Sequence, residues 1–254
     1  MPAIASHRVS AAAEQAWNRE ALAPPVTAPR AALWHYDGTA VVLGCSQPLH
    51  DRYPAGLTMV KRSAGGGAVL AGRWMLSLSV VLPSEHPLAA VGLVESYRWL
   101  GQLIADELAA LGIAAEALAP AALPPSDGKL HWACFGGLSP WEVVVAGRKI
   151  AGLAQRRCRN GVLLAAGILL DASPWPLLCA AMDREPAAAA QLEAVTMSCA
   201  EALGHTVSIH DLSAALEQSL GEILFADVAV GSAHRRQRQP AAVGLGGHCS
   251  PTNP

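Results

Sequence analysis

The sequence contains few charged residues and no excess of charge of either sign. Charged residues make up 15% of its 254 residues, and the formal net charge is −2 at pH 7. This balance favours neither nucleic acid nor an anionic membrane surface as a partner. No apolar run reaches the roughly 18–20 residues that a membrane span requires. Residues 1–10 lack a basic start with a long apolar core, so we expect no secretory signal and a cytoplasmic protein.

Several well-known catalytic and metal-binding patterns are also absent. The six cysteines include no Cys-x-x-Cys pair, and the histidines show neither His-x-x-x-His nor His-Glu-x-x-His spacing. We therefore expect no metal site and no disulfide framework. No Gly-x-Ser-x-Gly elbow presents a serine nucleophile. The chemistry must be sought in other residues.

The composition allows a large core. Hydrophobic residues make up 52% of the chain, and a chain of this size buries roughly 70–75% of its unfolded surface. We expect a catalytic domain over residues 1–185, a small helical extension over 186–233 and a disordered tail over 234–254. The order of strands and helices favours an α+β fold over strict βαβ alternation.

Hydrophobic periodicity and breaker residues predict the individual elements. In the helix expected over 10–22, Ala12, Ala16 and Leu22 should face inward. Strands 31–36 and 40–45 should be joined at Asp37-Gly38 as a hairpin. The predicted helices are 10–22, 91–112, 174–182 and 211–224, the predicted strands are 31–36, 40–45, 58–61, 75–82, 141–145, 150–155 and 161–170, and 114–125 is a predicted loop.

A glycine-rich segment follows the strand at 58–61. Glycines permit close approach of the backbone to a ligand, and successive N–H groups can hold a phosphate or carboxylate. The segment lacks the final Gly-Lys-Ser/Thr of a Walker loop, and a strand follows it where a dinucleotide-binding loop would have a helix. It is a candidate binding loop, with a plain flexible turn as the alternative. Its candidate residues are Arg62, Ser63, Gly65, Gly66, Gly67 and Ala68.

One cysteine and one lysine lie fifteen residues apart in the most distinctive stretch of the chain, residues 132–155. A thiol and an amine held together can move an acyl group through a thioester. Cys134 sits in an apolar segment, where the alternative is an inert core residue. Lys149 falls at a predicted hairpin tip, where the alternative is a solvated side chain; its catalytic role would be to stabilise charge on an acyl oxygen. The basic residues Arg156, Arg157 and Arg159 form either a solvated face or a docking patch for an acidic carrier.

Three ordered motifs together resemble a known superfamily. They are R-S-A-G-G-G-A-V, then C-F-x-x-x-S-x-W-E-V-V-V-x-G-R-K-I-A-G-x-A-Q-R-R, then G-V-L-L-x-x-G-I-L-L-D. The chain resembles the biotin/lipoate protein ligase superfamily, in its lipoate-protein ligase A and cysteine-dependent octanoyltransferase branch, over residues 11–178. The resemblance implies a mixed, mostly antiparallel sheet flanked by helices, related to class II aminoacyl-tRNA synthetases.

The resemblance also implies a set of site residues. Cys134 falls where the octanoyltransferases of this branch carry their nucleophile, and Lys149 falls on the lysine that contacts the acyl carbonyl. From their position in the chain, and not from the resemblance, we expect the apolar Leu70, Leu153 and Ile168 to line a tunnel for the alkyl chain. The implied acyl-binding residues are Arg62, Ser63, Gly65, Gly66, Gly67, Ala68, Gly152, Ala154 and Gln155.

The implied activity is transfer of octanoyl or lipoyl from acyl carrier protein to a lysine of a lipoyl domain or glycine-cleavage H protein. Such transfer needs no metal and no ATP, because a thioester is already activated. One alternative is an ATP-dependent lipoate-protein ligase, with ATP and Mg as cofactors; another is a non-catalytic acyl- or carrier-binding homologue. Two departures from the family pattern, Ala71-Gly72 for His-Asp and Ala165-Ala166 for Gln-His, remove polar groups near the expected pocket.

Overall fold

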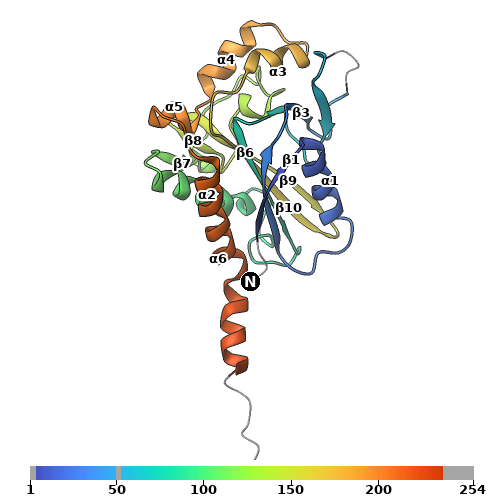
Figure 1. The fold of residues 1–254 in the computed structure, drawn as a ribbon, viewed down its shortest axis with the longest axis vertical. Coiled ribbons are helices and arrows are strands. Elements are labelled where there is room, and N and C mark those ends of the chain that lie inside the picture. Colours follow the sequence, from blue (N-terminus) through green and yellow to red (C-terminus); the bar gives the residue numbers. More distant parts are fainter. Residues whose placement is uncertain (1–3, 50–52, 237–254) are drawn as a thin grey trace, which may run out of the picture.

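The computed structural model describes residues 4–49 and 53–236 and is built around a seven-stranded mixed sheet (Figure 1). Only the outermost pair, β1 and β2, is parallel; the other neighbours in this sheet are antiparallel. The expected α+β fold with a mostly antiparallel sheet is thereby confirmed. In spatial order the strands are β1 (Ala5–Val9), β2 (Arg30–Tyr36), β6 (Met75–Leu82), β10 (Gly161–Leu169), β9 (Arg148–Cys158), β8 (Val143–Val145) and β7 (Ala115–Ala117).

A second, three-stranded sheet carries the chain into the glycine-rich segment. It consists of β4 (Thr58–Lys61), β3 (Ala40–Leu43) and β5 (Val69–Ala71), with β3 in the middle. Here β3 pairs with β4 in parallel and with β5 antiparallel. Residues 31–36 and 40–45 are therefore not a hairpin. The strands form as expected, but the chain passes from one sheet to the other at Asp37-Gly38.

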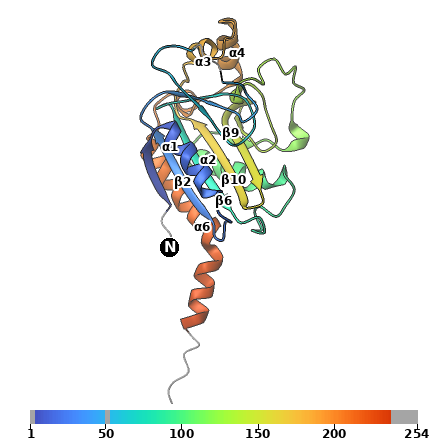
Figure 2. The same ribbon diagram turned by 90° about the vertical axis from the view of Figure 1, so that its right-hand side faces the viewer.

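The two faces of the large sheet are covered by different helices. Leu76, Leu78 and Val80 of β6 belong to a core shared with α2 (Arg98–Ala110) and α6 (Ile209–Arg236). The opposite face is covered by α1 (Ala11–Ala21), which lies in front of the strands in Figure 2. Strand alternation places Ser77 and Ser79 of β6 on this second face. The layer between α1 and the sheet thus contains polar side chains, unlike an ordinary apolar core.

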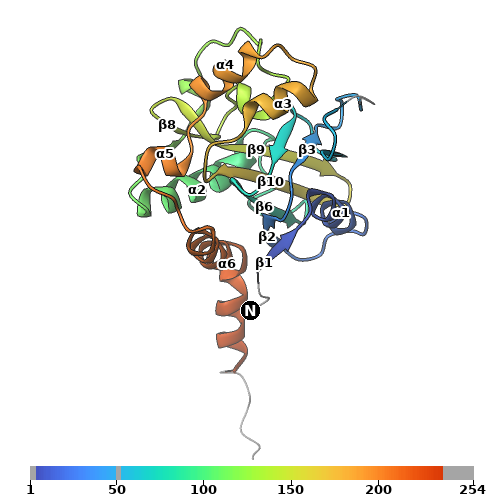
Figure 3. The same cartoon turned by 45° about the horizontal axis from the view of Figure 1, so that its top comes forward.

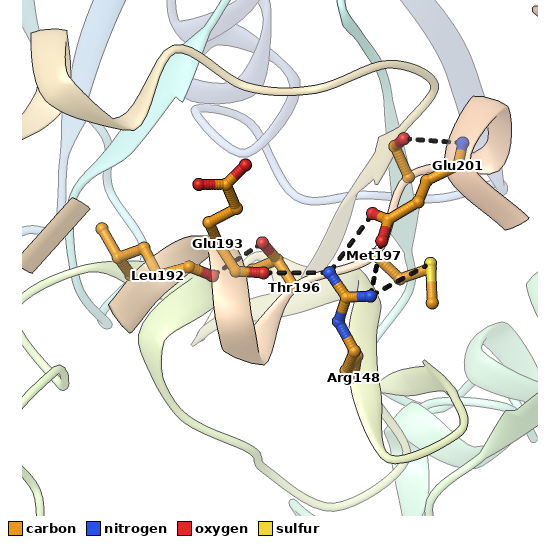
Figure 4. A network of polar contacts seen from close by, with 7 residues as sticks. Arg148, Leu192, Glu193, Thr196, Met197 and Glu201 are labelled. Atoms are coloured by element: carbon orange, nitrogen blue, oxygen red, sulfur yellow. Dashed lines mark hydrogen bonds and ion pairs between the residues drawn. The ribbon is translucent and has the colours of Figure 1, made fainter. Parts of the chain in front are cut away.

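Three short helices cover the end of the molecule near the β8–β9 turn (Figure 3). They are α3 (Trp175–Ala181), α4 (Ala187–Val195) and α5 (Cys199–Leu203). Arg148 at the start of β9 ties α4 and α5 to the turn: its guanidinium donates to the Glu193 carbonyl at 3.0 Å and pairs with Glu201 at 2.5 Å (Figure 4). The Met197 N–H also donates to the Lys149 carbonyl at 2.9 Å. The helices after residue 185 are therefore attached to the strand that carries Lys149.

Three further boundaries differ from the sequence prediction. The helix expected from residue 91 begins only at Arg98, after a short 3-10 turn, η1 (Glu95–Tyr97). The loop expected over 114–125 contains the edge strand β7 and the turn η2 (Pro120–Ala122). The tail expected from 234 continues α6 for three residues, and the rest of it lies outside the described residues. The proposed domain limit at 185 stays a prediction.

Gly101 of α2 packs so closely against another segment that a larger side chain does not fit, although helix propensity alone would favour alanine there. A methyl group there would lie 2.1 Å from the Trp141 carbonyl oxygen, whereas one at Gly221 of α6 would meet nothing within 4 Å. Alanine is favoured over glycine inside helices by up to about 1 kcal/mol. We expect Gly221→Ala to raise the melting temperature and Gly101→Ala to lower stability by about 1–3 kcal/mol. Calorimetry of both variants checks this. An equal rise in melting temperature for the two variants would contradict the close contact of Gly101.

Candidate active site

Lys149 is a buried cation, not a solvated hairpin tip. Its side chain is only 2% exposed. Its ammonium donates to the carbonyl oxygens of Cys134 at 2.7 Å and Gly137 at 2.9 Å, and it pairs with the Glu142 carboxylate at 2.6 Å. An ammonium has three N–H donors, so these three partners use all of them. The solvated alternative is thus wrong.

Glu142 is one of the residues that the sequence prediction missed. It is 2% exposed, and besides Lys149 it accepts hydrogen bonds from the N–H groups of Ser139 at 2.7 Å and Leu153 at 3.2 Å. A buried carboxylate is tolerated when it is paired and hydrogen-bonded in this way. The available signal was its position directly before Val143 in an otherwise apolar strand. A lone charge there predicts a buried partner of opposite sign.

Cys134 and Lys149 meet at Gly152. A methyl group on Gly152 would contact the Cys134 Sγ at 3.6 Å, the Lys149 Cε at 3.2 Å and a Glu142 oxygen at 3.7 Å. The thiol therefore lies beside the ion pair, and glycine keeps this point open. Tyr97 also belongs to the neighbourhood: burial, followed by the charges of Glu142 and Cys134, raises the pKa of its hydroxyl to about 12. The thiol is partly exposed, so it is not sealed in a core.

The glycine-rich loop is joined directly to the cysteine segment. The Cys134 N–H donates to the Ala68 carbonyl at 2.9 Å, and the Ala68 N–H donates to the Trp132 carbonyl at 2.7 Å. A methyl group on Gly67 would lie 2.7 Å from the Cys134 nitrogen, so only glycine allows this approach. The sequence motifs that lie far apart in the chain are thus brought together.

Arg62 closes the glycine-rich loop. It is 8% exposed, and its guanidinium donates to the carbonyls of Gly65 and Gly67, both at 2.8 Å, and to that of Val42 at 3.4 Å. Most of its donors therefore hold the loop in shape. Its charge still acts on the groups around it, including Glu14.

A cavity of about 60 Å³ opens beside the thiol and runs under α1. Its lining includes the predicted residues Arg62, Ser63, Cys134, Gly152 and Ala154. The predicted residues Gly65, Gly66 and Gln155 line a neighbouring pocket with Glu142 and Tyr97 instead. Of the three residues expected to line an alkyl tunnel, Leu153 borders the cavity, whereas Leu70 and Ile168 pack in the two cores and do not line it.

Small residues in register make the floor of this cavity. Gly152 of β9 pairs with Gly167 of β10, which pairs with Ser77 of β6. Two residues along, Ala154 pairs with Ala165 in the same way. Directly paired residues of antiparallel strands share a face, so these short side chains leave a groove across three strands on the α1 side. Ala165 is one of the residues that line the cavity.

The roof of the cavity is unexpectedly polar. The side of α1 that faces the sheet consists of Ala11, Glu14, Gln15, Asn18 and Ala21, all buried. The prediction for this helix was therefore wrong at Ala12, which is exposed, and at Ala16, which is only half-buried; at Leu22 it was right. The physical reason is that β2 and β6 offer polar partners on this face, so the polar stripe of the helix turns inward.

Glu14 is the centre of that polar roof. The Tyr36 hydroxyl donates to it at 2.5 Å and the Ser77 hydroxyl at 3.1 Å. Burial raises the pKa of its carboxyl group, and hydrogen bonds from Tyr36, Ser77 and Gln15, together with the charge of Arg62, oppose this. Burial is the larger effect, so the neutral carboxyl is favoured relative to water.

The described residues show no metal site and no membrane span. No group of three or more His, Cys, Asp or Glu side chains in residues 4–49 and 53–236 is placed to hold a metal ion. Within the same residues, no helix has both the length and the apolar character that crossing a bilayer takes.

Sequence comparison and fold comparison with known proteins point to the same family. The family model for the lipoyl protein ligase A/B catalytic domain matches residues 11–221. Octanoyltransferase LipM of Kyrpidia tusciae is 31% identical over 73% of this chain and 70% of its own length; that of Symbiobacterium thermophilum is 32% identical over 71% and 67%. A crystal structure of lipoate-protein ligase A with bound ATP superposes with a TM-score of 0.65 at 18% identity, covering 87% of this chain and 85% of that chain. A lipoate protein ligase structure from T. acidophilum with lipoic acid gives 0.63 at 17% identity, covering 87% and 85%.

The buried ion pair predicts a strong coupling between its two residues. Glu142→Gln leaves the Lys149 ammonium buried without its negative partner, so we expect a loss of about 3–5 kcal/mol in unfolding free energy. Removing both charges, in Glu142→Gln/Lys149→Met, should restore a large part of this loss. Urea unfolding of the single and double variants measures the coupling, and strictly additive losses would contradict it.

The Glu14 carboxyl predicts a pH-dependent stability. Because its folded pKa is raised above 4.5, the folded protein holds its proton over a window in which the unfolded chain releases it, and stability is lost as pH rises through that window. Glu14→Gln removes this loss, so its melting temperature relative to the parent should rise with pH above about 4.5. Glu20→Gln, on the exposed side of the same helix, is the matched control. A Glu14→Gln difference that does not change with pH would contradict the assignment.

Proposed function

Because the chain belongs to the lipoyl protein ligase A/B catalytic-domain family, and LipM proteins are among its relatives, we infer that it is an octanoyltransferase of protein lipoylation. The observation that carries the mechanism is the place of the Cys134 thiol, beside a buried cation and at a cavity. Cys134 is the nucleophile of our proposal. Its Sγ lies beside the Lys149–Glu142 ion pair.

The proposed reaction has two balanced steps. In the first step the Cys134 sulfur gives up its proton and attacks the thioester carbonyl of the acyl donor; the new carbon–sulfur bond forms, the donor's carbon–sulfur bond breaks, and the donor sulfur takes up the released proton and leaves as a thiol. In the second step the neutral acceptor lysine amine attacks the acyl-enzyme; a carbon–nitrogen bond forms, the bond between the acyl carbon and the Cys134 sulfur breaks, and the proton lost by the amine passes to that sulfur, which restores the Cys134 thiol. Lys149 stabilises negative charge on the carbonyl oxygen in both steps.

The dimensions of the groove support a medium-length acyl chain. From Gly152 to Ser77 the groove crosses two strand spacings, which is roughly 10 Å. An extended chain of single bonds advances about 1.2 Å per bond, as the polypeptide backbone does. The groove therefore matches an octanoyl group lying along Gly167 with its carbonyl at Cys134. Gly152 and Ala154 are the acyl-binding residues that we propose with most structural support.

The proposed partners follow from this chemistry. The donor is an acyl carrier protein and the acceptor a lipoyl domain or glycine-cleavage H protein. Arg156, Arg157 and Arg159, on β9 and just after it, are the proposed docking residues for an acidic carrier; Arg157 also donates to the Ala89 carbonyl at 2.8 Å. No ATP or metal is consumed, because the donor thioester supplies the activation.

Intact mass spectrometry tests the proposal. After incubation with octanoyl-acyl carrier protein, we expect one octanoyl adduct that hydroxylamine removes, present in Cys45→Ser and absent in Cys134→Ser. Cys45 is exposed and lies outside the cavity lining, so it is the matched control. An adduct that survives in Cys134→Ser would overturn the nucleophile. Lipoylation of a lipoyl domain by Cys134→Ser with lipoate and ATP would instead establish the ligase alternative, and ligand binding without either reaction would establish the binding-protein alternative.

A further inference from the structure

Asn18 is an unpaired amide in the wall of the cavity. It is 2% exposed, and its Oδ1 has no hydrogen-bond partner. Neither oxygen nor nitrogen of this amide is bonded to any of the described residues. A buried polar group left without a partner costs about 1–3 kcal/mol. Native proteins avoid that cost unless a ligand or a water supplies the missing bonds.

The amide belongs to the part of the cavity remote from the thiol. Asn18 lies one helical turn after Glu14, about 6 Å along α1. Glu14 in turn contacts Ser77, which is two strands away from Gly152 and the thiol. One end of the cavity therefore lies at the Cys134 thiol, and the other end lies against the Glu14 carboxyl group and the Asn18 amide.

At this polar end, Glu14 has hydrogen-bond partners, whereas Asn18 has none among the described residues. Both oxygens of Glu14 already accept, from Tyr36 and Ser77. Asn18 has an acceptor oxygen and two N–H donors unused by the protein. An unsubstituted alkyl end would leave all of them unpaired. A hydroxyl group both donates and accepts, so it can pair with the Asn18 oxygen and nitrogen together.

We propose that this enzyme prefers a medium-length acyl group carrying a hydroxyl near the end remote from the thioester, and that Asn18 is the residue that selects it. The proposal rests on the acyl transfer proposed above. The hydroxyl binds between Asn18 and the Glu14 carboxyl, and the apolar middle of the chain lies over Gly167 and Ala165. The specificity arises because a buried site built for a hydroxyl rejects the analogue that lacks it.

Competing thioesters provide the direct test. The probes are octanoyl-coenzyme A and 8-hydroxyoctanoyl-coenzyme A, and the measurement is kcat/KM for formation of the Cys134 acyl-enzyme. We expect the hydroxylated probe to be preferred about tenfold, which corresponds to one hydrogen bond of about 1.4 kcal/mol. In Asn18→Leu, where an apolar side chain of similar shape replaces the amide, the preference should reverse. Arg19→Leu, on the exposed side of α1, should keep the parent ratio.

The outcomes separate this proposal from the proposed function. Equal or better loading of the octanoyl probe by the parent enzyme overturns the preference, and an unchanged ratio in Asn18→Leu overturns the role of Asn18. If neither probe forms an acyl-enzyme, the transfer mechanism fails, and calorimetry with the free acids then tests the cavity by itself. Tighter binding of 8-hydroxyoctanoate than octanoate, lost in Asn18→Leu, supports the proposal. Equal binding means that Asn18 holds a water molecule, and it overturns the proposal.

Discussion

The geometry of the site depends on the solvation of one buried ammonium. Lys149 lies among residues of the apolar interior, so it must replace its lost water with protein oxygens. Its three partners come from a single stretch of chain, at Cys134, Gly137 and Glu142. That stretch must therefore curl around the ammonium. The position of the Cys134 thiol is a consequence of this curl, because the carbonyl of the same residue is one of the three oxygens.

The same requirement links the remaining elements to the site. Arg148 and the Lys149 backbone hold α4 and α5, so the helices that follow the Cys134 and Lys149 motifs stabilise the start of β9. On the other side, the hydrogen bonds between Ala68 and residues 132–134 attach the glycine-rich loop to the cysteine segment. The loop and the helices can influence the site without contacting a substrate. Each limits how far Cys134 and Lys149 can move apart.

Much of the fold followed from the sequence: β6 alternates serine with large apolar residues along most of its length, and β10 is an apolar run that begins at Gly161. The cysteine, the lysine and the glycine-rich loop were found because they occur in ordered motifs. The inward-facing polar side of α1 was not predictable from one sequence. Periodicity assigns alanines to the core and Glu14 and Asn18 to solvent, and only the partners on β2 and β6 reverse that assignment. The failed hairpin at Asp37-Gly38 has the same origin, since a turn dipeptide does not encode which sheet the next strand joins.

The filled donors of Lys149 constrain the role that we propose for it in acyl transfer. A substrate carbonyl can hydrogen-bond to this ammonium only by displacing one of the present oxygens. Displacing Glu142 would separate two buried charges, the most costly exchange of the three. A backbone carbonyl costs less to release, and that of Gly137 is the more distant of the two, at 2.9 Å against 2.7 Å for Cys134. Gly137 also borders a pocket of about 650 Å³, which gives its carbonyl access to water once it is released. In the transfer that we propose, the ion pair stays intact while one neutral hydrogen bond is exchanged for the acyl oxygen.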